Sequence, residues 1–227
     1  MRGGKPHRAS LNREGQLRAI MSHDYVQYGC GWCAPKDWIN FDSSPTLRFE
    51  RLPVVGRLYT KNARRFPENV RFGDIVRGLP VAPGSCRGVY CSHVLEHLAL
   101  DECDIALKHT YNYLESGGTF RFVLPDLEYL AHRYVNDKEP DAAIRFMQGT
   151  DLGKPRRRRG LSGVVVESLG NSAHLWLWDE KSLAKKLAEH GFKEIRRASF
   201  GDAEDPRFNE VEDKGRFENA LAMQCRK

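Results

Sequence analysis

Short apolar runs alternate with polar, glycine-rich or proline-rich stretches along most of the chain after residue 24. Runs of this kind, bounded by glycine, proline or aspartate, predict β-strands rather than helices. The expected strands lie at residues 25–28, 38–41, 70–72, 88–91, 119–124, 192–200 and 220–224.

Longer segments with apolar residues at helical spacing predict α-helices between the later strands. Leu107, Tyr111 and Leu114 recur on one face of residues 101–115, and Gly117-Gly118 follows as a predicted stop. Further helices are expected after Pro125-Asp126, at residues 141–147, and from an Asp179 cap to His190 before Gly191. Residues 55–64 have only weak helical potential, and residues 79–84 form a loop by their proline and glycine content.

The predicted order of strands and helices defines an α/β fold. Four strands come first, then strands and helices alternate, and two strands close the chain, which favours a mostly parallel sheet with a final hairpin-like pair. The stretch between Gly29 and Asp42 is too short for a full crossover helix, so that helix should be shortened or missing. Ligands bind such sheets at the carboxyl ends of the strands.

Composition and charge refine this picture. The chain has 227 residues, of which 41% are hydrophobic, and this suits one domain with a sizeable core. Its net charge of +6 is concentrated at the N-terminus and in Arg156–Arg159. We therefore expect a basic extension at 1–24 and a single domain at 25–227 with an insertion at about 149–178. No signal-peptide core or membrane-length apolar run is visible, so a cytoplasmic protein with reduced cysteines is expected.

One short motif matches a zinc-peptidase pattern. His93, Glu96 and His97 form H-x-x-E-H, which on a helix would place two imidazoles and a carboxylate on one face. That arrangement needs a helix through His93, but a predicted strand ends at residue 91. It also needs a third ligand, for which only the scattered His109, His132 and His174 are available. We therefore expect no bound metal.

Cys30-Gly31-Trp32-Cys33 matches a redox C-x-x-C motif. Such a motif lowers the pKa of its first cysteine through a following helix N-terminus. Pro35 and the next strand leave little room for that helix, so a glycine turn is the favoured interpretation.

Two aspartates follow strands in the same part of the predicted sheet. Asp42 ends the second strand and Asp74 follows the third, while Gly29-Cys30-Gly31 ends the first. A glycine turn lets backbone approach a ligand closely, and carboxylates at strand ends accept hydrogen bonds from ribose hydroxyls or an adenine amino group. Together these residues predict a nucleotide-binding edge.

These motifs in this order resemble the class I S-adenosylmethionine-dependent methyltransferases, in particular a subgroup of small bacterial predicted methyltransferases. The matching segments are YGCG at 28–31, WINFD at 38–42, DIVRGLPVAPGSCRGVYCSHVLEHL from Asp74, YLESGGTFRFVLPDLEYL from Tyr113, and the C-terminal HLWLWDEKSLAKKLAEHGFKEI and GDAEDPRF. The resemblance covers roughly residues 25–226. It implies a Rossmann-like sheet of order 3-2-1-4-5-7-6 with strand seven antiparallel and helices on both faces.

The resemblance also implies a set of cofactor contacts. Gly29, Cys30 and Gly31 would pass beneath the methionine moiety, Asp42 would hold the ribose hydroxyls, Asp74 and Ile75 would border the adenine, and Ser92 and His93 would lie near the sulfonium. The HVLEH run would begin the helix after strand four, with Leu95 and Leu98 as packing residues and Glu96 and His97 as orienting or structural groups.

The expected activity is methyl transfer from S-adenosylmethionine to an unidentified acceptor. His93 and His174 are the candidate general bases for a hydroxyl acceptor. Arg156, Arg157, Arg158 and Arg159 would suit an anionic small molecule or a glycan precursor. The alternatives are an inactive cofactor-binding partner subunit, a zinc hydrolase using His93-Glu96-His97, and a nucleic-acid methyltransferase using the arginine run.

Overall fold

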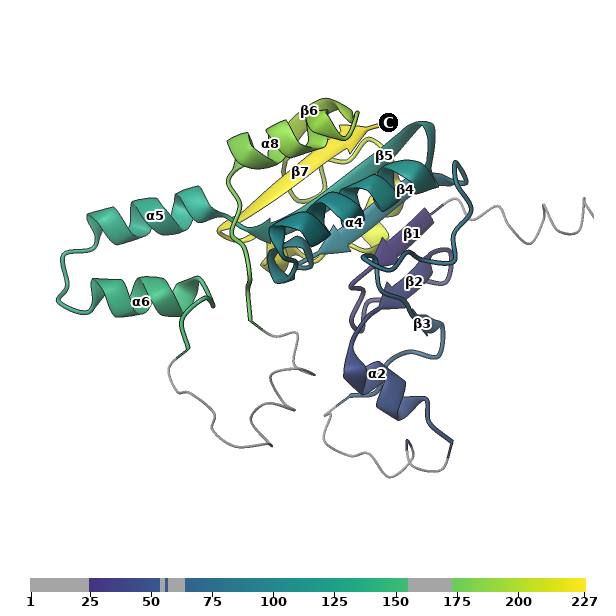
Figure 1. Cartoon of the computed structure of the whole chain (residues 1–227), viewed down its shortest axis with the longest axis horizontal. Coiled ribbons are helices and arrows are strands. Elements are labelled where there is room, and N and C mark those ends of the chain that lie inside the picture. Colours follow the sequence, from purple (N-terminus) through teal and green to yellow (C-terminus); the bar gives the residue numbers. More distant parts are fainter. Residues whose placement is uncertain (1–24, 54–55, 57–63, 155–172) are drawn as a thin grey trace, which may run out of the picture.

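Seven strands form one sheet in the order β3-β2-β1-β4-β5-β7-β6 in the computed structural model (Figure 1). The structure describes residues 25–53, 56, 64–154 and 173–227. β1 to β5 pair in parallel, whereas β7 is antiparallel to both β5 and β6. The expected fold class, strand order and antiparallel seventh strand are confirmed.

The strands are β1 (Tyr25–Tyr28), β2 (Ile39–Asp42), β3 (Val70–Phe72), β4 (Cys86–Ser92), β5 (Leu114–Pro125), β6 (Lys193–Ala198) and β7 (Ala220–Arg226). The α-helices are α2 (Pro45–Glu50), α4 (Leu100–Tyr113), α5 (Leu127–Asn136), α6 (Ala142–Gly149), α8 (Glu180–Glu189) and α9 (Lys214–Phe217). Two 3₁₀ turns, η1 (Leu95–His97) and η2 (Pro206–Glu210), complete the described elements.

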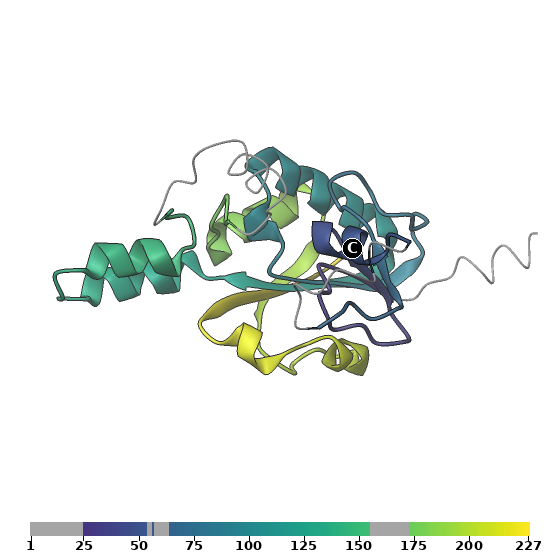
Figure 2. The ribbon, with the colours of Figure 1, turned by 90° about the horizontal axis from the view of Figure 1, so that it is seen from below.

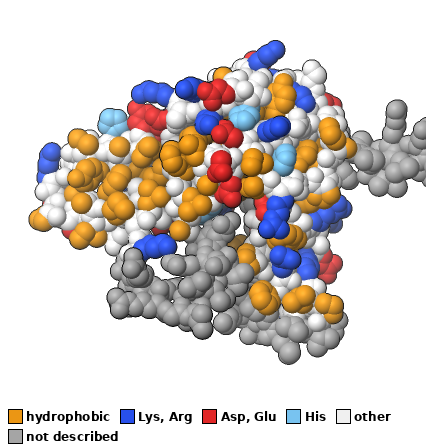
Figure 3. Space-filling view, in the orientation of Figure 1, with side chains coloured by type: hydrophobic (Ala, Val, Ile, Leu, Met, Phe, Trp, Pro, Cys, Tyr) orange, Lys and Arg blue, Asp and Glu red, His pale blue; other side chains and the backbone are white. Residues whose placement is uncertain are grey.

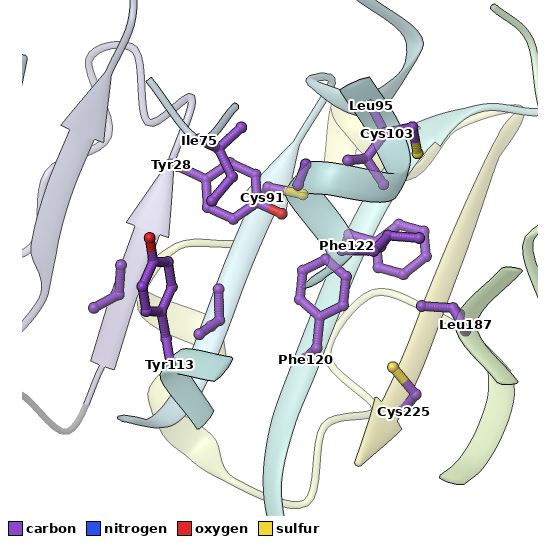
Figure 4. Close-up of a cluster of buried hydrophobic side chains, with 14 of the residues drawn as sticks. Tyr28, Ile75, Cys91, Leu95, Cys103, Tyr113, Phe120, Phe122, Leu187 and Cys225 are labelled. Atoms are coloured by element: carbon purple, nitrogen blue, oxygen red, sulfur yellow. The ribbon is translucent and has the colours of Figure 1, made fainter. Parts of the chain in front are cut away.

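Apolar side chains pack on both faces of the sheet, and Figure 2 shows the sheet between two layers of covering segments. α4 and α8 cover one face, where β-strand residues such as Cys91, Phe120 and Phe122 pack against Leu187 (Figure 4). On the other face Phe208 of η2 packs among Tyr25, Trp38 and Tyr90. Successive residues of a strand point to opposite faces, so the buried run of β4 supplies both layers.

α5 and α6 form a helical hairpin that projects from the body (Figures 1 and 2). Arg145 joins the two helices through Asp137, at 2.7 Å. Neither helix has a buried residue, and hydrophobic side chains gather on this hairpin's surface (Figure 3). The exposed apolar residues here are Tyr129, Tyr134, Val135, Ile144 and Met147.

Three local predictions were wrong. The helix expected over 101–115 ends at Tyr113 and β5 begins at once, so Gly117-Gly118 lies inside a strand. The HVLEH run does not begin the next helix, because it contains only the 3₁₀ turn η1 and α4 starts at Leu100. α2 was not expected; a Ser44 cap and Pro45 at its first turn start it. Most of the weakly helical 55–64 lies outside the described residues.

Other expectations hold. No helix connects β1 to β2 within residues 29–38, and Asp179 caps α8 by accepting from the Ser182 amide. All six cysteines are free thiols. Within the described ranges no helix is both long and apolar enough to cross a membrane. The N-terminal extension 1–24 and Arg156–Arg159 lie outside the described residues.

Candidate functional site at the carboxyl edge of the sheet

A glycine turn after β1 forms the first part of the site. Gly29 and Gly31 both have positive φ, +69° and +53°, where a side chain is strained. A Cβ at Gly29 would lie 2.2 Å from Cγ2 of Val94, whereas a Cβ at Gly31 would meet nothing within 4 Å. The Cys30 amide donates to the Phe41 carbonyl at 3.1 Å and pins the turn to β2. Val94 therefore leaves no room for a side chain at position 29, whereas the space beside position 31 is open.

Asp42 ends β2 and ties that strand to the turn. Its Oδ2 accepts from the Gly31 amide at 2.9 Å, and its Oδ1 accepts from the Ser44 amide at 2.8 Å. The short sequence separation of Gly31 and Asp42 therefore goes with a direct hydrogen bond between the two residues. Because each carboxylate oxygen has two lone pairs, each retains one for a ligand, although Asp42 is only 8% exposed.

Asp74 and Ile75 follow β3 and differ in what they present. Asp74 Oδ1 accepts from the Val76 amide at 2.9 Å, and its Oδ2 lies 3.4 Å from Nε of the exposed Arg77. The Ile75 side chain is buried in the core beside Tyr28 (Figure 4). Of the two residues, Asp74 has the more accessible side chain, and Ile75 can meet a ligand only through its backbone.

His93 follows Ser92 at the end of β4 and is held in a strained conformation. Its φ is +54°, in the left-handed region that non-glycine residues rarely adopt. Nδ1 lies 3.0 Å from Oε1 of Glu96, and Nε2 lies 3.4 Å from the carbonyl oxygen of Arg216. Since both ring nitrogens face oxygen acceptors, His93 has no ring nitrogen clearly free to take a proton from an acceptor.

His174 reaches the same edge from far along the chain. Its Nδ1 donates to the Thr150 carbonyl at 2.7 Å, which leaves Nε2 as the lone-pair nitrogen of the neutral ring. Its ring lies 4.9 Å from that of His97, centroid to centroid. The structure thus brings both His93 and His174 close to one residue, Glu96.

Three residues at this edge, Glu96, His97 and Val94, carry only weak signals in the sequence. The H-x-x-E-H spacing did mark Glu96 and His97, but nothing in the sequence could choose His174 as their neighbour over His109 or His132. Val94 gave no signal at all, because its role is a steric one against Gly29.

The two cysteines of the turn are poorly suited to redox chemistry. Burial and the charge of Asp42 raise the pKa of Cys30 far above its ordinary range. Burial and the charge of Asp213 also raise the pKa of Cys33. Because the thiolate is the reactive species, both thiols are less reactive than a free cysteine.

The structure of this chain is similar to several solved protein structures. No family model matches the chain, and no curated protein matches it. A methyltransferase from Thermotoga maritima, described as S-adenosylmethionine-dependent and as a possible histamine N-methyltransferase, is 16% identical with a TM-score of 0.49, over 90% of this chain and 82% of that one. A protein from Archaeoglobus fulgidus is 13% identical with a TM-score of 0.46, over 95% of this chain and 91% of that one. A protein from Mesorhizobium loti is 14% identical with a TM-score of 0.45, over 93% of this chain and 96% of that one. Both are described as S-adenosylmethionine-dependent methyltransferases. The strand order and the direction of β7, rather than these distant likenesses, define the fold.

Proposed function

We propose that this protein transfers a methyl group from S-adenosylmethionine to an acceptor. The observation that carries the proposal is the bond between the Gly31 amide and the Asp42 carboxylate. It joins an open, left-handed glycine turn after β1 to the buried carboxylate of the last residue of β2, at the edge where parallel sheets commonly bind ligands.

The residues at this edge fit the cofactor. The Gly29–Gly31 backbone would lie under the methionine moiety, since Gly31 has no atom within 4 Å of the position that a Cβ would fill. The remaining lone pairs of Asp42 would accept from the ribose hydroxyls, and Asp74 would accept from the adenine amino group. Ser92 and His93 would border the reacting end.

When bound, the cofactor supplies a methyl group on a positively charged sulfur, which passes to a nucleophile as the carbon–sulfur bond breaks. The chain mainly has to align the two reactants, an effect worth up to about 7–11 kcal/mol in well-oriented systems. For a hydroxyl acceptor, His174 is the better placed of the two predicted histidines to take the proton, because its Nε2 carries the lone pair. His93, held between Glu96 and Arg216, would orient the end of β4.

For the acceptor we infer a small anionic molecule or a glycan precursor. Arg156–Arg159 would supply positive charge from the insertion, and Trp176, which is 42% exposed near His174, would stack on a flat or sugar-like surface. A nucleic-acid acceptor would instead depend on phosphate contacts with the same arginines, with steeply salt-dependent binding.

Calorimetric titration with S-adenosylmethionine tests the proposal. The informative variant is Gly31→Ala, and its matched control is Gly84→Ala. Both glycines have positive φ, +53° and +66°, and both have open space at the Cβ position, so the two substitutions strain the backbone similarly. Only the methyl group at position 31 would enter the proposed cofactor site.

We expect wild type and Gly84→Ala to bind one equivalent of cofactor with similar affinity, and Gly31→Ala to bind at least tenfold more weakly. The proposal fails if folded wild-type protein binds no S-adenosylmethionine. Binding without methylation of any small molecule, glycan or nucleic acid offered would favour the inactive partner subunit instead.

A further inference from the structure

We propose that Glu96, His97 and His174 form a binding site for one divalent transition-metal ion of the zinc type. One potential ligand atom from each residue lies within 4.8 Å of the other two. Two imidazoles and one carboxylate are a ligand set typical of catalytic zinc and of iron sites with open positions. This proposal departs from the metal-free site expected from the sequence.

The Glu96 carboxylate is the first reason. Its side chain has no exposed area, and neither oxygen accepts an aligned hydrogen bond from the described residues. His93 Nδ1 lies 3.0 Å from Oε1 and can form an ion pair with that oxygen. The case for a metal therefore depends on Oε2, which has no hydrogen-bond partner among the described residues. A buried carboxylate is rarely left without hydrogen bonds unless it is paired or coordinates a metal.

The second reason is that both imidazoles are set to coordinate through Nε2. His97 Nδ1 lies 3.1 Å from the Ala173 carbonyl oxygen, and His174 Nδ1 lies 2.7 Å from that of Thr150. A carbonyl can only accept, so Nδ1 carries the hydrogen in each ring, and Nε2 of each neutral ring has its lone pair available. Metal-binding histidines are commonly held by this kind of hydrogen bond from the other nitrogen.

The third reason is that the backbone already holds the ligands together. The Glu96 carbonyl accepts from the Leu175 amide at 2.8 Å and from the Trp176 amide at 3.1 Å. η1 and the segment after His174 are therefore joined at Glu96 itself. An ion about 2.1 Å from each ligand atom needs those atoms roughly 3.4 Å apart in tetrahedral geometry. The three atoms lie within 4.8 Å of one another, so their side chains would have to move closer on binding.

The ligand set also indicates which ion would bind. Imidazole suits zinc, iron and related ions, whereas Mg²⁺ favours oxygen ligands and retains its water. Three protein ligands leave at least one position open to an oxygen donor. With Nε2 of His174 on the metal, that residue could not act as a general base, so the base role proposed above applies only to the metal-free chain.

The experiment uses the full-length, untagged chain after treatment with a chelator, titrated with Zn²⁺ against a chromophoric competitor. The variants are His97→Ala, His174→Ala and Glu96→Gln, and the control is His132→Ala, whose ring is 74% exposed and outside the group. Co²⁺ titration followed by visible absorption reports the coordination directly, and circular dichroism confirms that each variant is folded.

We expect one Zn²⁺ per wild-type and His132→Ala chain, with affinity at least 100-fold lower in His97→Ala and His174→Ala and at least tenfold lower in Glu96→Gln. Mg²⁺ should not compete at equal concentration. The metal site would be overturned if the wild type failed to bind Zn²⁺. It would also be overturned if folded His97→Ala and His174→Ala bound Zn²⁺ as tightly as the wild type does. This test can succeed or fail independently of the proposed methyl transfer. Zn²⁺ affinity decides the metal site, whereas S-adenosylmethionine affinity is measured separately on the chelator-treated chain.

Discussion

Arg121 and Glu212 form an ion pair in which neither side chain is exposed to solvent. Arg121 lies in the middle of β5, and its guanidinium also reaches Asp202 at 2.8 Å and the Ser199 carbonyl at 2.7 Å. The pair thus fastens the long β6–β7 connection to the centre of the sheet. This connection carries η2 and α9, which cover the second apolar layer.

Removing Arg121 should destabilise the fold strongly. Arg121→Met leaves Glu212 buried without its cation, and losing one partner of a buried pair costs about 3–5 kcal/mol of unfolding free energy. Arg121→Met/Glu212→Leu should recover most of that loss, because the uncompensated charge is gone. Urea unfolding of the two variants and wild type measures both effects. A loss below about 1 kcal/mol in the single variant would contradict a buried pair.

Gly29 should tolerate no side chain while Val94 is present. Gly29→Ala would add left-handed strain of about 1–2 kcal/mol and a clash with Val94 at 2.2 Å, which overpacking studies place at about 1–3 kcal/mol. The double variant Gly29→Ala/Val94→Ala should remove the clash but keep the backbone strain. Its loss of unfolding free energy should therefore be smaller than the sum of the losses in Gly29→Ala and Val94→Ala. Thermal unfolding of all four proteins completes the cycle. Additive effects would show that Val94 does not close the turn.

Acid should weaken the Asp202 contact. Burial alone would raise the pKa of Asp202, but hydrogen bonds from Arg196 and Arg121 hold it below its ordinary value. The unfolded chain therefore takes up this proton at a higher pH than the folded chain, at about pH 3.9. The stability from this group is complete above that pH and is lost as the pH falls through the lower, folded pKa. Urea unfolding between about pH 5 and pH 2 should show a shallower loss for Asp202→Asn than for wild type.

One thiol per chain should react in the native protein. Cys33 is the exposed cysteine, and the other five are buried. Burial and Asp213 raise the pKa of Cys33, so its reaction with a disulfide reagent near neutral pH should be slower than that of free cysteine. The amount of chromophore released should correspond to one reactive thiol per native chain and six per denatured chain. Rapid reaction of two thiols in the native state would revive the redox interpretation of Cys30 and Cys33.

The sequence by itself predicted the sheet well because its strands are short apolar runs ended by glycine or aspartate. Their order along the chain, with the resemblance of the ordered motifs, was sufficient for the topology that the structure confirms. Local boundaries were harder. Gly117-Gly118 looked like a helix stop, but pairing of Leu114 with Cys86 of β4 extends the strand back to Leu114, and pairing between distant strands outweighs local propensity.

The candidate site divides in the same way. Gly31, Asp42 and Asp74 could be predicted as site residues because each lies at or just beyond the carboxyl end of a strand, and parallel strands bring those ends to one edge. The sequence could not show that Asp42 bonds the Gly31 amide, that Val94 fills the space over Gly29, or that His174 joins Glu96 and His97. Those contacts depend on how the β4–α4 connection and the segment at 173–176 pack in three dimensions. Sequence thus predicted the edge at which we propose that a ligand binds. Only tertiary packing decided which side chains meet there, because contacts between distant segments leave no periodic pattern along the chain.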